Sequence, residues 1–352
     1  MATITEKRNK INDTAPAIAS HVLVLGDSIG RDFRFGVSGG AMLDQIAAIS
    51  SITGETALVN AAFGGYKLMD QSGDDRFLNF ADLAEANGLT AAKTIMGNFP
   101  PVDGVVISLG ANDLGNVETA PNAISGYDAG KVRAGLDRLI AEIRAENITN
   151  GYSDGVLPVV LLVPGRDRST GGKRGGSQTW REGSIAAAAA DSHVRLLDYY
   201  DVDLEDSVHP SAAGAQTVGW RAGRLIASMM EDIDFADGGP PSITSIARID
   251  DQTIRVNFNV PSGQQLIQPA FPTSWRVENA DTQSELQIAR LDWIDSNEAN
   301  LILAEGSSAH FRLFAPHDLV ERFAPEGVIR TLEDSNDHAP GFVLQSFAGS
   351  TA

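Results

Sequence analysis

The stretch VLVLGDSIGRDF, residues 22–33, joins a strand-like apolar run to a chemically reactive side chain. Residues 22–25 are apolar, the run ends at Gly26, and an acid and the hydroxyl of Ser28 follow at once. An apolar run that stops at glycine is typical of a strand leaving the core for the surface. The pattern therefore predicts that Ser28 is presented at the end of a strand.

On either side of this stretch, short apolar runs alternate with helix-like segments from residue 20 to residue 232. This alternation is typical of an α/β unit with a parallel sheet. We expect strands at residues 22–25, 57–60, 104–109, 157–163 and 194–197, and helices that include residues 42–50, 131–146 and 212–230. Because these strands are apolar on both faces, helices should cover both sides of the sheet in a three-layer sandwich.

The character of the chain changes near residue 234, where DFADGGPPS has the glycine, proline and acid content of a linker. Beyond it, TIRVNFNV alternates apolar and polar residues, and further short apolar runs are separated by Asn, Asp, Gly and Ser. We therefore predict an N-terminal extension at residues 1–19, an α/β domain at 20–233, a linker at 234–241 and an all-β, sandwich-like accessory domain at 242–352. Its aromatic residues suggest either a core or a carbohydrate-binding surface; they include Trp275, Trp293, Phe311 and Phe314.

Composition excludes several classes of protein. The 352 residues include 46 Asp and Glu against 27 Lys and Arg, and the formal charge of −19 opposes binding to nucleic acid or to an anionic membrane. The lack of cysteine excludes disulfides, cysteine nucleophiles and cysteine-ligated metals. No membrane span and no signal peptide is visible, so we expect a soluble protein that is cytoplasmic, exported without a leader or particle-associated.

A serine hydroxyl becomes a good nucleophile when a base takes its proton, and the base is usually a histidine held by a carboxylate. Of the six histidines, His209 alone has an acid, Asp206, at a D-x-x-H spacing that places both side chains on one side of a turn. Pro210 suits the first position of a helix, so we expect His209 at the helix cap.

The oxyanion of ester hydrolysis needs fixed hydrogen-bond donors, and polar or glycine residues follow two more of the expected strands. The candidate donors are the Ser28 amide, the Gly65 amide and the Asn112 side chain, whereas we expect Asp113 to be a structural hydrogen-bonding residue. A lone serine after a strand is more often a helix cap, and Asn112 alone would be an ordinary turn residue. A metal site would leave Ser28 and the glycines without a purpose, although four residues suit one: Asp27, Asp113, Asp206 and His209.

Four blocks, GDSIG, NAAFGG, GAND and DSVH, occur here in the order found in the SGNH (GDSL-type) hydrolases, which residues 20–232 resemble. The resemblance implies a flavodoxin-like α/β/α fold. It also implies that Ser28 is the nucleophile, His209 the base and Asp206 its orienting acid, with Ser28, Gly65 and Asn112 as the oxyanion hole. Two departures are Ile29, where leucine is usual, and Gly64, which leaves a one-residue ambiguity beside Gly65.

These observations predict a metal-independent serine esterase that forms an acyl-enzyme on Ser28 and acts on a small acyl ester. We favour O-acetyl removal from a carbohydrate such as an acetylated polysaccharide, because an appended β domain is a common way to hold a polymer near a catalytic domain. The alternatives are a short-chain lipase or lysophospholipase, and a non-catalytic surface or particle-associated binding module. The sequence leaves the oligomeric state and the ester's alcohol open.

Overall fold

The computed structural model describes most of the chain, in two compact units. The described residues are 18–33, 37–51, 55–68, 89–119, 123–152, 156–164, 176–206, 208–231, 240–262, 264–272, 275–307, 310–316, 329, 344–345 and 347–351. The first unit comprises Met1–Pro164, Arg168–Leu197 and Val202–Asp234, and the second comprises Gly165–Asp167, Asp198–Asp201 and Phe235–Ala352. Residues 1–17 of the expected extension and residues 234–239 of the expected linker lie outside the described residues.

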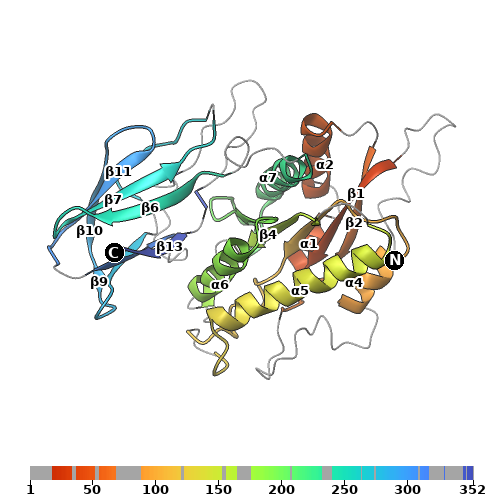
Figure 1. Cartoon of the computed structure of the whole chain (residues 1–352), viewed down its shortest axis with the longest axis horizontal. Helices are drawn as coiled ribbons and strands as arrows, with labels where there is room; N and C mark the ends of the chain where they lie inside the picture. The colour runs from red at the N-terminus through yellow and green to blue at the C-terminus, as the bar shows by residue number, and fades with distance from the viewer. Residues whose placement is uncertain are drawn as a thin grey trace. The chain divides into compact units, whose positions relative to one another are not determined.

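The first unit is built on a five-stranded parallel sheet (Figure 1). Its strands are β1 (Ile18–Gly26), β2 (Glu55–Ala62), β3 (Gly104–Ser108), β4 (Val159–Val163) and β5 (Val194–Asp198). Their order is β2-β1-β3-β4-β5, which is the flavodoxin-like order. The chain leaves β1 to one side for β2 and returns to the other side for β3, so the crevice between β1 and β3 is where such folds bind ligands.

Helices cover both faces of this sheet (Figure 1). They are α1 (Ser28–Asp32), α2 (Val37–Ile49), α4 (Leu89–Met96), α5 (Ala129–Thr149), α6 (Gly176–Ala190) and α7 (Ala212–Met230). Figure 1 shows α2 and α7 together on one face, and α4, α5 and α6 on the other. The three-layer α/β/α fold predicted from the sequence is confirmed.

The strands of this sheet are apolar on both faces because helices pack against both. β3 and β4 are buried throughout, and the side chains on one of their faces, such as Val105 and Leu161, join those of α4, α5 and α6 in one core. α2 and α7 approach unusually closely through glycines: a Cβ atom on Gly219 would lie 2.0 Å from the Ser38 carbonyl oxygen. The lack of a side chain at Gly219 therefore lets the two helices pack closely at this point.

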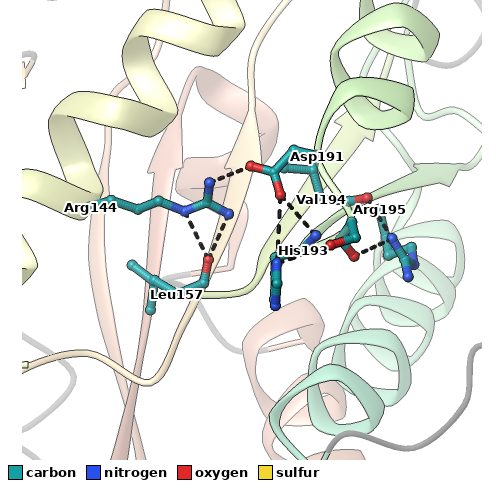
Figure 2. A network of polar contacts seen from close by, with 7 residues as sticks. Arg144, Leu157, Asp191, His193, Val194 and Arg195 are labelled. Carbon is teal, nitrogen blue, oxygen red and sulfur yellow. Dashed lines mark hydrogen bonds and ion pairs between the residues drawn. The ribbon is translucent and has the colours of Figure 1, made fainter. Parts of the chain in front are cut away.

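The edge of the sheet where β4 and β5 begin is held by a polar network (Figure 2). From α5, the Arg144 guanidinium donates two hydrogen bonds, of 3.0 and 3.1 Å, to the Leu157 carbonyl oxygen and forms an ion pair with Asp191. Asp191 in turn accepts a 2.8 Å hydrogen bond from the His193 N–H. The network ties α5 to the loops that start both strands, at the opposite edge from the strand ends that carry the GDS and GAND blocks.

The second unit holds two four-stranded sheets in its described part. Their strands are β6 (Ser242–Arg248), β7 (Thr253–Asn259), β8 (Arg276–Asn279), β9 (Glu285–Leu286), β10 (Ile288–Trp293), β11 (Glu298–Leu303), β12 (Phe311–Ala315) and β13 (Phe347–Ser350). The sheet orders are β10-β11-β7-β6 and β13-β12-β8-β9, and the pairs are antiparallel. The predicted all-β character of the C-terminal region is confirmed.

Burial decides the role of the C-terminal aromatic residues. Phe311 and Phe314 are buried, at 0% and 3% exposure, so the suggestion that they line a carbohydrate surface is wrong. Trp293 is half-buried, stacks on Phe258 with ring centroids 5.2 Å apart and donates a hydrogen bond to the Pro269 carbonyl oxygen. Trp275 packs against the same Phe258 ring at 6.4 Å. Phe311 belongs to the core of the second unit, and Trp275 and Trp293 pack against that core.

No helix in the described part of the chain combines the length and the apolar character needed to cross a membrane.

Candidate active site

Ser28 lies at the carboxyl end of β1, where the backbone turns sharply into α1. Gly26 has a φ of +134°, and a Cβ atom there would lie 1.8 Å from the Ser108 carbonyl oxygen on β3. Only glycine fits this conformation and this close approach. Asp27 then caps α1 by accepting a 3.0 Å hydrogen bond from the Ile29 N–H, so Ser28 is the first residue of the helix.

Ser28, His209 and Asp206 form one hydrogen-bonded chain. The His209 Nε2 atom is 2.8 Å from the Ser28 Oγ atom, and the His209 Nδ1 atom is 2.7 Å from the Asp206 Oδ2 atom. The side chains of Asp206 and His209 are 50% and 26% exposed, so solvent reaches this side of the site. The structure therefore brings together the three residues that the sequence predicts to be catalytic.

The Asp206 carboxylate fixes the tautomer of His209. The partial burial of Asp206 would by itself raise the pKa of its carboxyl group. Hydrogen bonds from the His209 and Val208 N–H groups and from the His209 ring outweigh this effect and lower the pKa to about 2. Asp206 is thus an anion that can only accept at neutral pH. The His209 Nδ1 atom must carry the hydrogen, which leaves Nε2 free to accept the proton of the Ser28 hydroxyl.

The support of His209 differs from the sequence prediction. α7 begins at Ala212, not at Pro210, and its cap is Ser211, whose hydroxyl accepts a 3.2 Å hydrogen bond from the Gly214 N–H. The prediction that His209 sits at the helix cap is therefore wrong by two residues, because the serine side chain is the better cap. Pro210 instead forms an isolated β-bridge with Leu204, which folds the loop carrying Asp206 and His209 onto itself.

Gly64 and Gly65, the two glycines that follow β2, have different surroundings and different roles. Gly65 has a φ of +84°, and a Cβ atom there would meet nothing within 4 Å, so its backbone faces open space. A Cβ atom on Gly64 would lie 3.0 Å from the Arg31 Nη1 atom and 3.9 Å from the Ser28 Cβ atom. Gly64 therefore leaves room beside Ser28, and Gly65 supplies the left-handed turn.

The three predicted oxyanion donors keep N–H groups available. Among the described residues, the backbone N–H groups of Ser28 and Gly65 donate to no hydrogen-bond acceptor. The Asn112 side-chain amide donates a 3.1 Å hydrogen bond to the Tyr66 carbonyl oxygen, next to Gly65, and its second N–H has no acceptor in the described part of the chain. Each of the three groups follows the carboxyl end of a different strand, β1, β2 or β3.

Asp113, which the sequence indicates to be structural, is fully buried. Its Oδ2 atom accepts a 2.9 Å hydrogen bond from the Leu68 N–H, and its Oδ1 atom accepts a 3.1 Å hydrogen bond from the Tyr127 hydroxyl. Burial, followed by the Asp113 charge and hydrogen bond, raises the pKa of Tyr127, which therefore stays a donor. Asp113 thus anchors the segment after Gly65.

The sequence reasoning missed two supporting residues. The Asn60 side chain, at the end of β2, donates a 3.0 Å hydrogen bond to the Gly30 carbonyl oxygen and accepts one from the Ala62 N–H. The Ser108 hydroxyl, at the end of β3, donates a 3.3 Å hydrogen bond to Asp27. Both were visible as the polar residues that end apolar strands.

The candidate metal set does not gather at one point. Asp206 and His209 pair with each other beside Ser28, whereas Asp27 and Asp113 are buried at the carboxyl ends of β1 and β3. In the described part of the chain, no group of three or more His, Cys, Asp or Glu side chains has a geometry that could hold a metal ion.

A flavodoxin-like sheet with a serine, histidine and aspartate chain at its carboxyl edge defines a serine hydrolase of the α/β/α class. The GDSL-like lipase/acylhydrolase family matches residues 24–217, more than half of the chain, and the chain belongs to this family. It is a serine ester hydrolase.

Several solved structures are similar to this chain at low sequence identity, and the first of them shares its fold. A carbohydrate acetylesterase from Xanthomonas citri is 16% identical, with a TM-score of 0.63, and the match covers 95% of this chain and 81% of that one. A carbohydrate acetylesterase from Sinorhizobium meliloti (17% identity, TM-score 0.44) matches over 60% of this chain and 99% of its own. An aryl esterase from M. smegmatis (17% identity, TM-score 0.44) matches over 60% of this chain and all of its own. No curated protein sequence matches the chain.

Proposed function

We propose that this protein is a metal-independent carbohydrate O-acetylesterase that works through an acyl-enzyme on Ser28. The observation that carries the proposal is the unbroken hydrogen-bond chain from the Ser28 Oγ atom through His209 to Asp206, with links of 2.8 and 2.7 Å. At such a distance, the proton of the Ser28 hydroxyl can pass directly to the His209 Nε2 atom.

In the first half of the reaction, the Ser28 Oγ atom attacks the carbonyl carbon of the ester while the His209 Nε2 atom takes the hydroxyl proton. The carbonyl oxygen becomes an oxyanion, which the N–H groups of Ser28, Gly65 and Asn112 stabilise. The tetrahedral intermediate then collapses, the C–O bond to the alcohol breaks, and His209 returns the proton to the leaving oxygen. Asp206 stabilises the imidazolium that forms in between.

In the second half, water replaces the alcohol. His209 takes a proton from the water, the hydroxide attacks the acyl carbon, and the same donors hold the second oxyanion. Collapse of this intermediate breaks the bond to the Ser28 Oγ atom, which regains its proton from His209. The products are a carboxylic acid and the free enzyme, and none of these steps requires a metal ion.

The carbohydrate part of the proposal has separate support. The match to a carbohydrate acetylesterase that spans 95% of this chain includes the C-terminal region as well as the α/β unit. We infer that residues 242–352 form an accessory domain, with residues 20–233 as the catalytic domain and 234–241 as the linker. The catalytic unit and the β unit would then act together on a polymeric acetyl ester.

The test compares acetylated xylan with p-nitrophenyl acetate and p-nitrophenyl octanoate, all in the presence of a chelator. The proposal predicts release of acetate from xylan and a preference for the acetyl over the octanoyl ester of about tenfold or more, which a small acyl site would impose. Turnover of the octanoyl ester with no release of acetate from xylan would support a lipase-type activity instead.

A further inference from the structure

The Asp27 carboxyl group, directly before Ser28, is buried and only partly hydrogen-bonded. Asp27 is 1% exposed. Its Oδ1 atom accepts hydrogen bonds from the Ile29 N–H at 3.0 Å and from the Ser108 hydroxyl at 3.3 Å. Its Oδ2 atom is buried and has no hydrogen-bond partner among the described residues. A buried anionic oxygen without a donor is costly, whereas a neutral carboxyl group at the same place costs far less.

A second carboxyl group makes ionisation of Asp27 still less favourable. Asp113 is 0% exposed and repels a negative charge on Asp27. Burial first, and then the Asp113 charge, raise the pKa of Asp27 to about 7, against the lowering effect of the Ile29 N–H, the Ser108 hydroxyl and the nearby Gly30 N–H. These three donors are two backbone N–H groups and a hydroxyl, and none of them titrates near neutral pH. Asp113 is thus the titratable group that faces Asp27.

The charge of Asp27 also bears on the reaction. The Ser28 N–H, one of the proposed oxyanion donors, belongs to the residue that follows Asp27. An ionised Asp27 would place a negative charge close to the developing oxyanion, in a buried region where repulsion between like charges is strong. A neutral carboxyl group keeps the same hydrogen bond to the Ile29 N–H without this repulsion.

We propose that Asp27 is a positioning residue that works with its carboxyl group protonated, so that it caps the helix of the nucleophile without adding a negative charge beside the oxyanion. The inference rests on the proposed function of Ser28, Gly65 and Asn112. It assigns opposite ionisation states to the two aspartates nearest the nucleophile, Asp27 and Asp206.

Two variants separate the cap from the charge. Asp27→Asn has the shape of the neutral carboxyl group, because its Oδ1 atom still accepts from Ile29 and its NH₂ group replaces the hydroxyl. Asp27→Ala removes the cap. For p-nitrophenyl acetate near pH 6, we expect kcat of Asp27→Asn to stay within about threefold of wild type. Asp27→Ala should lose about tenfold or more in kcat at unchanged KM, because only the placement of Ser28 is disturbed.

The ionisation state is measured directly by carbon-13 NMR of the full chain with labelled aspartate carboxyl groups, the Asp27 signal being assigned by its loss in Asp27→Asn. We expect this signal at the protonated position at about pH 6, where exposed aspartates are ionised. An ionised Asp27 at about pH 5, or a loss of kcat in Asp27→Asn equal to that in Asp27→Ala, would overturn the proposal. Failure of the proposed function would appear separately, as wild-type turnover that does not depend on Ser28.

Discussion

At the scale of single residues, the site holds two aspartates whose pKa values move in opposite directions. Asp206 is half exposed and accepts two backbone N–H groups and the His209 ring, so its pKa falls to about 2. Asp27 is buried, with one carboxyl oxygen that meets no described donor, so its pKa rises to about 7. In the proposed site, these different environments give an anion beside His209, the proposed base, and a neutral carboxyl group that caps the helix of Ser28, the proposed nucleophile.

Asp206→Asn tests the orienting role. The asparagine NH₂ group would face the His209 Nδ1 atom as a donor and favour the wrong tautomer of the ring. We expect kcat for p-nitrophenyl acetate to fall by about 10²- to 10⁴-fold with little change in the far-UV spectrum. Asp137→Asn, on the exposed face of α5, is the matched control and should leave kcat unchanged. A kcat within a few-fold of wild type in Asp206→Asn would show that Asp206 does not hold His209.

At the scale of elements, glycines of α7 lie directly against the backbone of α2. In Gly219→Ala, the new methyl group would meet the Ser38 carbonyl oxygen at 2.0 Å, so the helices must move apart. We expect the free energy of unfolding to fall by about 2 kcal/mol or more, measured by urea denaturation.

The control for this substitution is Gly40→Ala in α2, where a Cβ atom would meet nothing within 4 Å. Alanine favours the helix there, so stability should stay equal or rise by up to about 1 kcal/mol. Equal losses in Gly219→Ala and Gly40→Ala would contradict the close packing of the two helices.

The polar network of Figure 2 makes a second prediction for the elements. Arg144→Ala removes the hydrogen bonds to the Leu157 carbonyl oxygen and the ion pair with Asp191, and Arg144 is only 18% exposed. We expect a loss of about 2 kcal/mol in the free energy of unfolding with kcat unchanged, because the network lies at the far edge of the sheet from the site. Arg133→Ala breaks an exposed pair with Asp137 and should cost less than about 0.5 kcal/mol. If Arg144→Ala lost as little stability as Arg133→Ala, the network would add no stability.

The sequence predicted the elements well where the pattern is local. The last helix was predicted at residues 212–230, its observed bounds, and TIRVNFNV shows the alternating burial expected of β7. β6, β8 and β13 were not predicted, because their few buried residues give no continuous pattern. The cap of α7 was misplaced because Pro210 and Ser211 are adjacent, and both residues favour a helix start.

At the scale of the whole molecule, stability should depend on pH through the same two aspartates. The folded pKa of Asp27 lies above the ordinary value of 3.8, so its contribution to stability is full below about pH 4 and is lost as the pH rises through 7. The folded pKa of Asp206 lies below 3.8, so its contribution is present above about pH 4 and is lost as the pH falls toward 2.

Thermal midpoints of the wild type, Asp27→Asn and Asp206→Asn between about pH 3 and pH 8 measure both effects. Asp27→Asn should gain stability relative to wild type as the pH rises from 4 to 7, whereas Asp206→Asn should lose stability as the pH rises from 3 to 5. A difference between Asp27→Asn and wild type that stays constant over this range would mean that Asp27 has an ordinary pKa in the folded protein.

The site is formed by residues from distant parts of the chain. This explains which of its residues could be predicted from the sequence alone. Ser28, Gly65, Asn112 and His209 were each found as polar or glycine residues at the ends of expected elements, since parallel strands bring their carboxyl ends to one edge. Three features depend on contacts between segments distant in sequence: the hydrogen bond from Asn112 to Tyr66, the Asp27 oxygen that has no partner among the described residues, and the support from Asn60. No local pattern encodes such contacts.

The most direct test of the central claim is the hydrolysis of p-nitrophenyl acetate by the wild type and by Ser28→Ala, with chelator present. If Ser28 is the nucleophile, the wild type turns over with chelator, and Ser28→Ala loses about 10³-fold or more in kcat while its thermal midpoint stays near that of the wild type. Equal turnover by the two proteins, or no turnover by either, would contradict the assignment of Ser28 as the nucleophile.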